Sequence, residues 1–110
     1  MKTIEKVATG GGLAFILFSA CAPFLPGPTL DGLSRIQADQ PGLTLSDLQT
    51  GRHLYAAHCA SCHQLHLPSE KTPQAWEKIV PRMGEKGKID QATCDSILAY
   101  LKAMGKKDSP

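Results

Sequence analysis

The sequence predicts a small all-helical domain of about three helices, and two observations support this fold class. Between residues 46 and 104, apolar side chains recur at three- and four-residue spacing, which is typical of helices buried on one face. Residues that commonly begin or end helices flank these segments, and no alternating strand pattern occurs. A domain of about 65 residues buries little apolar surface, so a cofactor or another staple is expected to stabilise it.

The first segment, residues 1–20, is predicted to be a signal peptide of the lipoprotein type. Lys2 and Lys6 precede an uncharged apolar stretch, and small residues stand directly before Cys21. This pattern resembles the lipobox of bacterial lipoproteins, although Phe18 replaces the usual leucine. We therefore expect an exported protein on the periplasmic side, anchored to the membrane by lipid on Cys21. Retention of the leader as a membrane helix and ordinary signal-peptidase cleavage stay open.

Residues 21–45 are predicted to be a flexible linker. The segment contains four prolines and three glycines and lacks a regular apolar spacing. As a flexible coil it would reach about 25 to 30 Å. The folded domain, residues 46–110, could then swing between partners at the membrane surface.

The first helix is expected to begin at Ser46 and to run up to the cysteine pair that starts at Cys59. Ser46 suits the N-cap position, and Asp47 suits the positive end of the helix dipole. Leu48 and Tyr55 lie on the face that we expect to be buried.

The second and third helices have clearer boundaries. The second begins at Thr72 with Pro73 in its first turn, and it should end near Pro81, because proline inside a helix removes a hydrogen bond. The third is capped by Asp90 and ends before Gly105. The apolar residues of these two helices are Trp76, Ile79, Val80, Ile89, Ile97 and Leu101.

One short motif carries the chemistry: residues 59–63 read Cys-Ala-Ser-Cys-His, the C-x-x-C-H pattern of c-type haem attachment. Two thiols one helical turn apart can form thioethers with the two haem vinyl groups, which holds His63 next to the iron. A zinc site would need Cys59, Cys62 and two histidines, chosen from His53, His58, His63 and His66, and such crowding is unusual. A thioredoxin-like redox pair expects a βαβ setting, which the sequence does not predict.

Residues 48–104 resemble a small mono-haem class I cytochrome c of bacteria. The resemblance rests on the motif at Cys59, Cys62 and His63, on Trp76 ahead of Met83, and more weakly on Gly51, Tyr55, Ile97, Tyr100 and Leu101. It implies an all-helical shell around one covalent haem c, with the first and last helices crossing near Gly51. It also implies electron transfer by Fe2+/Fe3+ cycling through an exposed haem edge.

An electron carrier needs a second axial ligand opposite His63, and Met83 is the expected one. It follows the second predicted helix and precedes two glycines, so it could loop over the other haem face. Met104 shares a face with Leu101 and is interpreted as helix packing. His66 is the least implausible histidine rival.

Further residues near the motif have two interpretations each. The Pro68 carbonyl could accept a hydrogen bond from His63, or Pro68 could be an ordinary turn residue. The Trp76 indole could donate to a haem propionate or only fill the core. The cations Arg82, Lys86 and Lys88 could form a docking rim, although a solvated loop is slightly favoured. Cys94 is expected to be a small buried apolar residue.

The combined prediction is a membrane-tethered electron carrier and not an enzyme, since no catalytic constellation of side chains stands out. Its partners would be redox proteins of a respiratory or periplasmic electron-transfer chain. A formal net charge of +2 excludes the basic footprint of a nucleic-acid binder. Two other functions stay open: a haem c subunit of a larger oxidoreductase complex, and an open-site haem sensor or catalyst.

Overall fold

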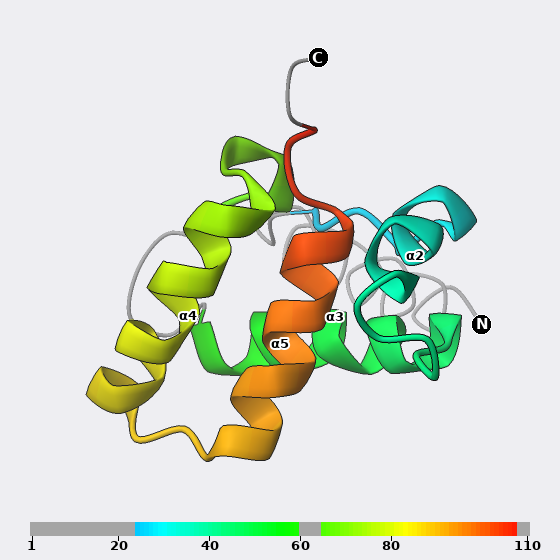
Figure 1. The fold of residues 1–110 in the computed structure, drawn as a ribbon. Helices are drawn as coiled ribbons and strands as arrows, with labels where there is room; N and C mark the ends of the chain where they lie inside the picture. Colours follow the sequence, from blue (N-terminus) through cyan, green and yellow to red (C-terminus); the bar gives the residue numbers. More distant parts are fainter. Residues whose placement is uncertain (1–23, 60–64, 108–110) are drawn as a thin grey trace, which may run out of the picture.

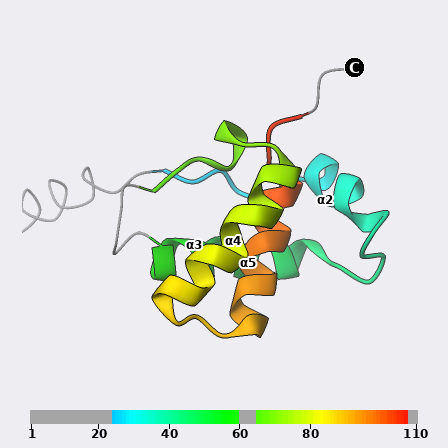
Figure 2. The same ribbon diagram turned by 60° about the vertical axis from the view of Figure 1, so that its left-hand side comes forward.

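The computed structural model describes residues 24–59 and 65–107, which contain helices and no strand, so the predicted all-helical class is confirmed there. The expected number of about three helices is too low, because four α-helices are present among the described residues. Its elements are α2 (Leu30–Gln37), α3 (Leu45–Cys59), the short 3-10 helix η1 (Pro68–Glu70), α4 (Pro73–Gly87) and α5 (Gln91–Ala103). α5 is central and packs against α3, α4 and α2, with α3 crossing behind it (Figures 1 and 2). Within the described residues, no helix is both long and apolar enough to span a bilayer.

The predicted flexible linker over residues 21–45 is wrong for the part that the structure describes, because residues 30–37 form α2. Thr29 caps this helix, and its side chain accepts a hydrogen bond from the Gly32 amide at 3.0 Å. Leu33 and Ile36 are buried against α3 and α5. α2 approaches α5 closely at Gly32, since a Cβ at this position would lie 2.8 Å from the Ala103 carbonyl oxygen.

The segment before α2 is also held in place. Leu25 is 4% exposed, and the Arg52 guanidinium donates two hydrogen bonds to the Leu25 carbonyl, at 3.2 and 2.8 Å. The Tyr100 hydroxyl donates to the Pro26 carbonyl at 2.6 Å. Burial raises the pKa of Tyr100 to about 12, so this hydroxyl keeps its proton at neutral pH. The folded domain therefore begins near residue 25 and not at residue 46.

α3 begins two residues earlier than predicted, with the same kind of side-chain capping. Thr44, and not Ser46, precedes the helix: its hydroxyl accepts from the Asp47 amide at 3.2 Å, and the Asp47 carboxylate accepts from the Thr44 amide at 2.9 Å. This reciprocal pair satisfies two amides at the start of the helix. Halfway along α3, Gly51 contacts Ser96 and Tyr100 of α5, so the expected crossing of the first and last helices is confirmed.

α4 continues through Pro81 to Gly87, so the predicted end of the second helix near Pro81 is wrong. Trp76, Val80 and Gly84, four residues apart, form a continuous buried stripe across the proline, while Pro81 itself is exposed. Packing of this stripe on α5 outweighs the local cost of a proline inside a helix, about 3 kcal/mol. The helix ends at Lys88, which adopts the left-handed conformation with φ 55°.

The core has two clusters on opposite sides of α5. The first holds Leu25, Tyr55, Trp76, Val80, Cys94, Ile97, Tyr100 and Leu101, and the second holds Leu33, Ile36, Leu48, Ala99 and Ala103. Asp90 stands at the N-cap of α5, and Gly105 follows its C-cap, as predicted for the third helix. Both sides of α5 are buried because α2, α3 and α4 all pack against it.

Candidate functional site

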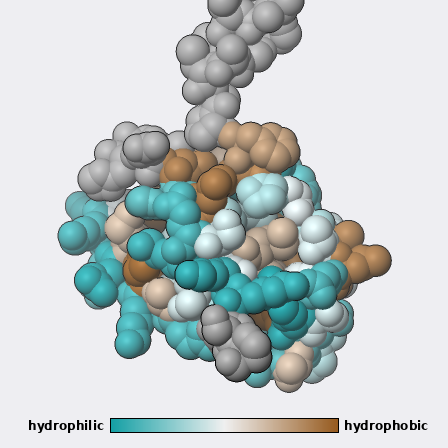
Figure 3. All heavy atoms as spheres, turned by 90° about the horizontal axis from the view of Figure 1, so that it is seen from above, coloured by the Kyte–Doolittle hydropathy of each residue, from teal (hydrophilic) through white to brown (hydrophobic). Residues whose placement is uncertain are grey.

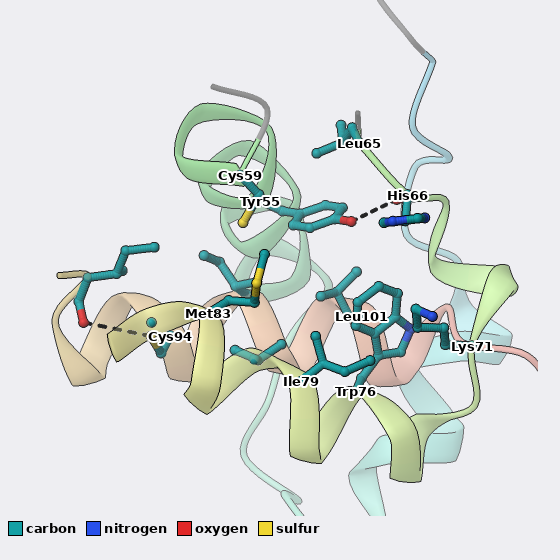
Figure 4. Close-up of a pocket in the computed structure, with 14 residues that line it drawn as sticks. Tyr55, Cys59, Leu65, His66, Lys71, Trp76, Ile79, Met83, Cys94 and Leu101 are labelled. Atoms are coloured by element: carbon teal, nitrogen blue, oxygen red, sulfur yellow. Dashed lines mark hydrogen bonds between the residues drawn. The ribbon is translucent and has the colours of Figure 1, made fainter. Parts of the chain in front are cut away.

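An apolar cavity of about 190 Å³ lies between the end of α3, the face of α4 and the buried side of α5 (Figure 4). Its lining residues are Tyr55, Cys59, Leu65, His66, Lys71, Trp76, Ile79, Val80, Met83, Gly84, Ile89, Cys94, Ile97 and Leu101. Most are hydrophobic or aromatic, as in pockets that hold an apolar cofactor. Cys59 and Leu65, the two described residues that flank positions 60–64, both line the cavity.

α3 supplies one wall of the cavity. Cys59, its last residue, points into the cavity from the end of the helix, one turn beyond Tyr55 (Figure 4). The Tyr55 hydroxyl donates to the His66 carbonyl at 2.8 Å, and its ring meets Trp76 edge-on with centroids 6.2 Å apart. Burial, followed by the nearby Cys59 thiol, raises the pKa of Tyr55, so Tyr55 acts as a neutral donor.

α4 supplies the opposite wall. Met83 follows Trp76 and Ile79 along one helical face, and its thioether lies at the same end of the cavity as the Cys59 thiol, on the facing wall (Figure 4). The Met83 residue is 38% exposed. The expectation that Met83 sits in a loop is wrong, because α4 runs on past Pro81, and its position at the cavity comes from helical register.

Trp76 and Pro68 contact each other directly. The indole N–H of Trp76, which is 3% exposed, donates to the buried Pro68 carbonyl at 2.9 Å. Trp76 is therefore part of the core. To donate to a propionate, the indole would have to exchange this partner, since it has a single N–H. The Pro68 carbonyl has a second lone pair for another donor.

The rival ligands have other contacts. His66 lines the cavity, but its Nδ1 lies 2.9 Å from the Glu70 carboxylate. The Leu67 amide and the His66 side chain lower the pKa of that carboxyl. Met104 does not line the cavity: it packs between the two core clusters, and the Thr29 hydroxyl lies 3.9 Å from its sulfur. Among the described residues, no three His, Cys, Asp or Glu side chains are grouped to bind a metal ion.

Cys94 is buried, as predicted, and it also lines the cavity. Its thiol lies 3.8 Å from the Ile89 carbonyl oxygen and against Gly84, so α4 and α5 approach closely here. Burial, with Asp90 and Asp95 nearby, raises the thiol pKa. The three cations Arg82, Lys86 and Lys88 are exposed on the end of α4, and the first two are helical and not in a loop.

Two cavity residues, Leu65 and Lys71, were not predicted from the sequence. They lie in connecting segments, where no periodic pattern indicates which side chains turn inward. Two of the residues predicted to bind the cofactor, Cys62 and His63, lie outside the described residues, as does Cys21.

The described walls fit an apolar macrocycle in chemistry: they offer hydrophobic surface, a thiol and a thioether. The volume of about 190 Å³ is below the ~300–1,000 Å³ typical of cofactor pockets. A haem-sized group would therefore extend beyond the walls formed by the described residues. Comparisons with protein families, with curated proteins and with solved structures gave no match to this chain.

Proposed function

We propose that this protein transfers single electrons by means of one covalent haem c. The observation that carries the proposal is that Cys59 and Met83 line two walls of the same apolar cavity. Cys59 opens the C-x-x-C-H motif, and a thioether is the axial ligand that raises the potential of carrier haems. The two features are 24 positions apart in the sequence, and only the fold brings them together.

The position of the rest of the motif is limited by chain length. His63 precedes the cavity residue Leu65 by two positions, and two residues span at most about 7 Å. Cys62 is three positions from both Cys59 and Leu65. Chain length therefore allows Cys62 and His63 to reach the cavity, which supports their proposed roles.

Each group of residues has a role in the proposed site. Cys59 and Cys62 would hold the haem by thioethers, and His63 and Met83 would be its axial ligands. When bound, the haem supplies an iron that cycles between Fe2+ and Fe3+. The apolar side chains of α4 and α5 exclude water from this site, and burial tunes the potential. The partly exposed Met83 is consistent with a haem edge that a redox partner can approach.

We further propose that the protein is a class I cytochrome c exported to the periplasmic side of a bacterial membrane and lipidated on Cys21. The uncharged leader and the small residues before Cys21 support this location. Its partners would be redox proteins of the same compartment. In membrane fractions, Cys21→Ser should release the protein into the soluble fraction, whereas Cys94→Ser should leave it bound.

Visible spectroscopy and intact mass of the purified chain test the haem assignment. We expect one covalent haem in the wild type and in Met83→Ala, and its loss in a Cys59→Ser/Cys62→Ser double variant. The weak far-red iron–sulfur band of the oxidised protein should disappear in Met83→Ala. It should persist in Met104→Ala, the matched control with a thioether away from the cavity. A wild-type chain without covalent haem would refute the proposal.

The same spectra separate the alternative functions. High-spin iron that binds carbon monoxide readily in the reduced wild type, unchanged by Met83→Ala, would indicate an open-site sensor or catalyst. Co-purification of a stable oxidoreductase with the haem protein would instead identify a subunit of a larger complex.

A further inference from the structure

The N-terminal end of the folded domain lies very close in sequence to the proposed lipid attachment. Phe24 is three positions after Cys21, and the next residues are fixed to the domain by the Arg52 and Tyr100 hydrogen bonds to the Leu25 and Pro26 carbonyls. Three residues span at most about 11 Å. The proposed tether is thus at most about 11 Å long, and not the roughly 25 to 30 Å expected of a flexible linker over residues 21–45.

The surface around this end combines exposed apolar and basic side chains. Phe24, at the start of segment 24–29, is 79% exposed, and Leu30, the first residue of α2, is 72% exposed. Figures 1 and 2 show this segment running across the upper side of the molecule, close to the end of α5. Seen from above, hydrophobic side chains gather beside the start of the described chain (Figure 3).

Two lysines share this side with Leu30. The Lys107 ammonium lies 3.6 Å from Asp31, the residue after Leu30, and Asp31 also pairs with Arg35 at 4.0 Å. Lys106, the neighbour of Lys107, is also exposed, and its amide donates to the Lys71 carbonyl at 2.8 Å. Apolar side chains next to lysines suit a bilayer interface, where rings enter the headgroup region and ammonium groups meet anionic phosphates.

We infer that this face, defined by Phe24, Leu30, Lys106 and Lys107, rests on an anionic phospholipid surface. The inference depends on the proposed lipid on Cys21, which would keep the start of the domain within about 11 Å of the membrane. The domain is then held in one orientation and does not swing on a long tether.

The orientation matters for the cavity. Leu25, one residue from Phe24, belongs to the same core cluster as Tyr55, Trp76 and Leu101, all of which line the cavity. The membrane-proximal segment is thus packed against the residues that form the candidate site. A redox partner would have to present its own centre near the membrane surface.

Fluorescence quenching of the full-length lipidated protein tests this orientation. The protein is reconstituted in vesicles of phosphatidylethanolamine and phosphatidylglycerol with brominated acyl chains. Phe24→Trp places the probe on the face, and Gln91→Trp places a control at the exposed start of α5. The wild type, with Trp76 alone, supplies the background. We expect Phe24→Trp emission to shift to shorter wavelength and to be quenched severalfold more than Gln91→Trp emission.

A flexible Gly/Ser insertion between Ala22 and Pro23 provides the second test. It should leave the protein bound to vesicles and remove most of the quenching in Phe24→Trp. Equal quenching at positions 24 and 91 overturns the inference, as does quenching that the insertion leaves unchanged. Intact mass reports lipid and haem separately: a chain without lipid on Cys21 also overturns the inference, whereas a chain with lipid but no haem refutes only the proposed electron transfer.

Discussion

The crossing of α3 and α5 at Gly51 can be tested by adding a single methyl group. A Cβ at Gly51 would overlap the backbone carbonyl of Ser96 and lie 2.8 Å from the Tyr100 Cβ. Neither atom can turn away, because one belongs to the backbone and the other is fixed to it. Overpacking of this kind costs about 1–3 kcal/mol, and we expect the upper end of that range.

The net effect of Gly51→Ala includes an opposing contribution. Alanine is favoured over glycine inside a helix by about 1 kcal/mol. The variant should therefore lose about 2 kcal/mol of unfolding free energy. For a domain of this size, that corresponds to a decrease in Tm of about 8–16 °C. Thermal unfolding of the haem-loaded protein, followed by far-UV circular dichroism, measures this decrease.

Gly87→Ala is the matched control. It also lies in a helix, but an added Cβ would meet only the Ile89 side chain at 3.4 Å, which is ordinary contact. This variant should be unchanged or more stable by up to about 1 kcal/mol. If Gly51→Ala were as stable as Gly87→Ala, the close approach of α3 and α5 would be wrong.

Four further predictions follow from single features of the structure. Leu25→Ala should lower the unfolding free energy in urea by about 2–5 kcal/mol, whereas a residue in a flexible linker would have no effect. Lys88→Gly should raise it by about 1 kcal/mol, because Lys88 adopts φ 55°. Since burial raises its pKa, the Cys94 thiol should react slowly with thiol reagents in the native protein at neutral pH and faster after unfolding. The Leu67 amide and His66 lower the pKa of Glu70, so NMR should show this carboxyl titrating below the usual range of glutamate. Its stabilising effect should be present above the unfolded pKa and lost as the pH falls through the folded pKa.

The main errors of the sequence analysis concern proline and glycine. Both residues usually indicate turns or flexibility, which led to a linker at residues 21–45 and to a helix end at Pro81. In α2, Thr29, Leu33 and Ile36 offered a helical signal, with a cap and an apolar spacing of three, but Gly32 masked it. Gly32 is needed for contact with α5, and contacts between distant segments cannot be read from local composition.

Met83 is a second case in which contacts between distant segments, and not local composition, decided the structure. Its residue type and distance from the C-x-x-C-H motif indicated an axial ligand, but its place in a loop was inferred from Pro81 before it and the two glycines, Gly84 and Gly87, after it. The buried stripe of Trp76, Val80 and Gly84 continues across that proline because α5 lies beneath it. Tertiary packing therefore determined the local structure.

By itself, the sequence determined the helical class, the boundaries of α5 and the C-x-x-C-H pattern on which the proposed function rests, since each depends on spacing within a few residues of the chain. Only the tertiary structure decided that Leu25 and α2 belong to the domain and that Cys59 and Met83 share one cavity. These features depend on the burial of apolar surface between segments far apart in the sequence, and this free energy outweighs local preferences for turns and helix ends.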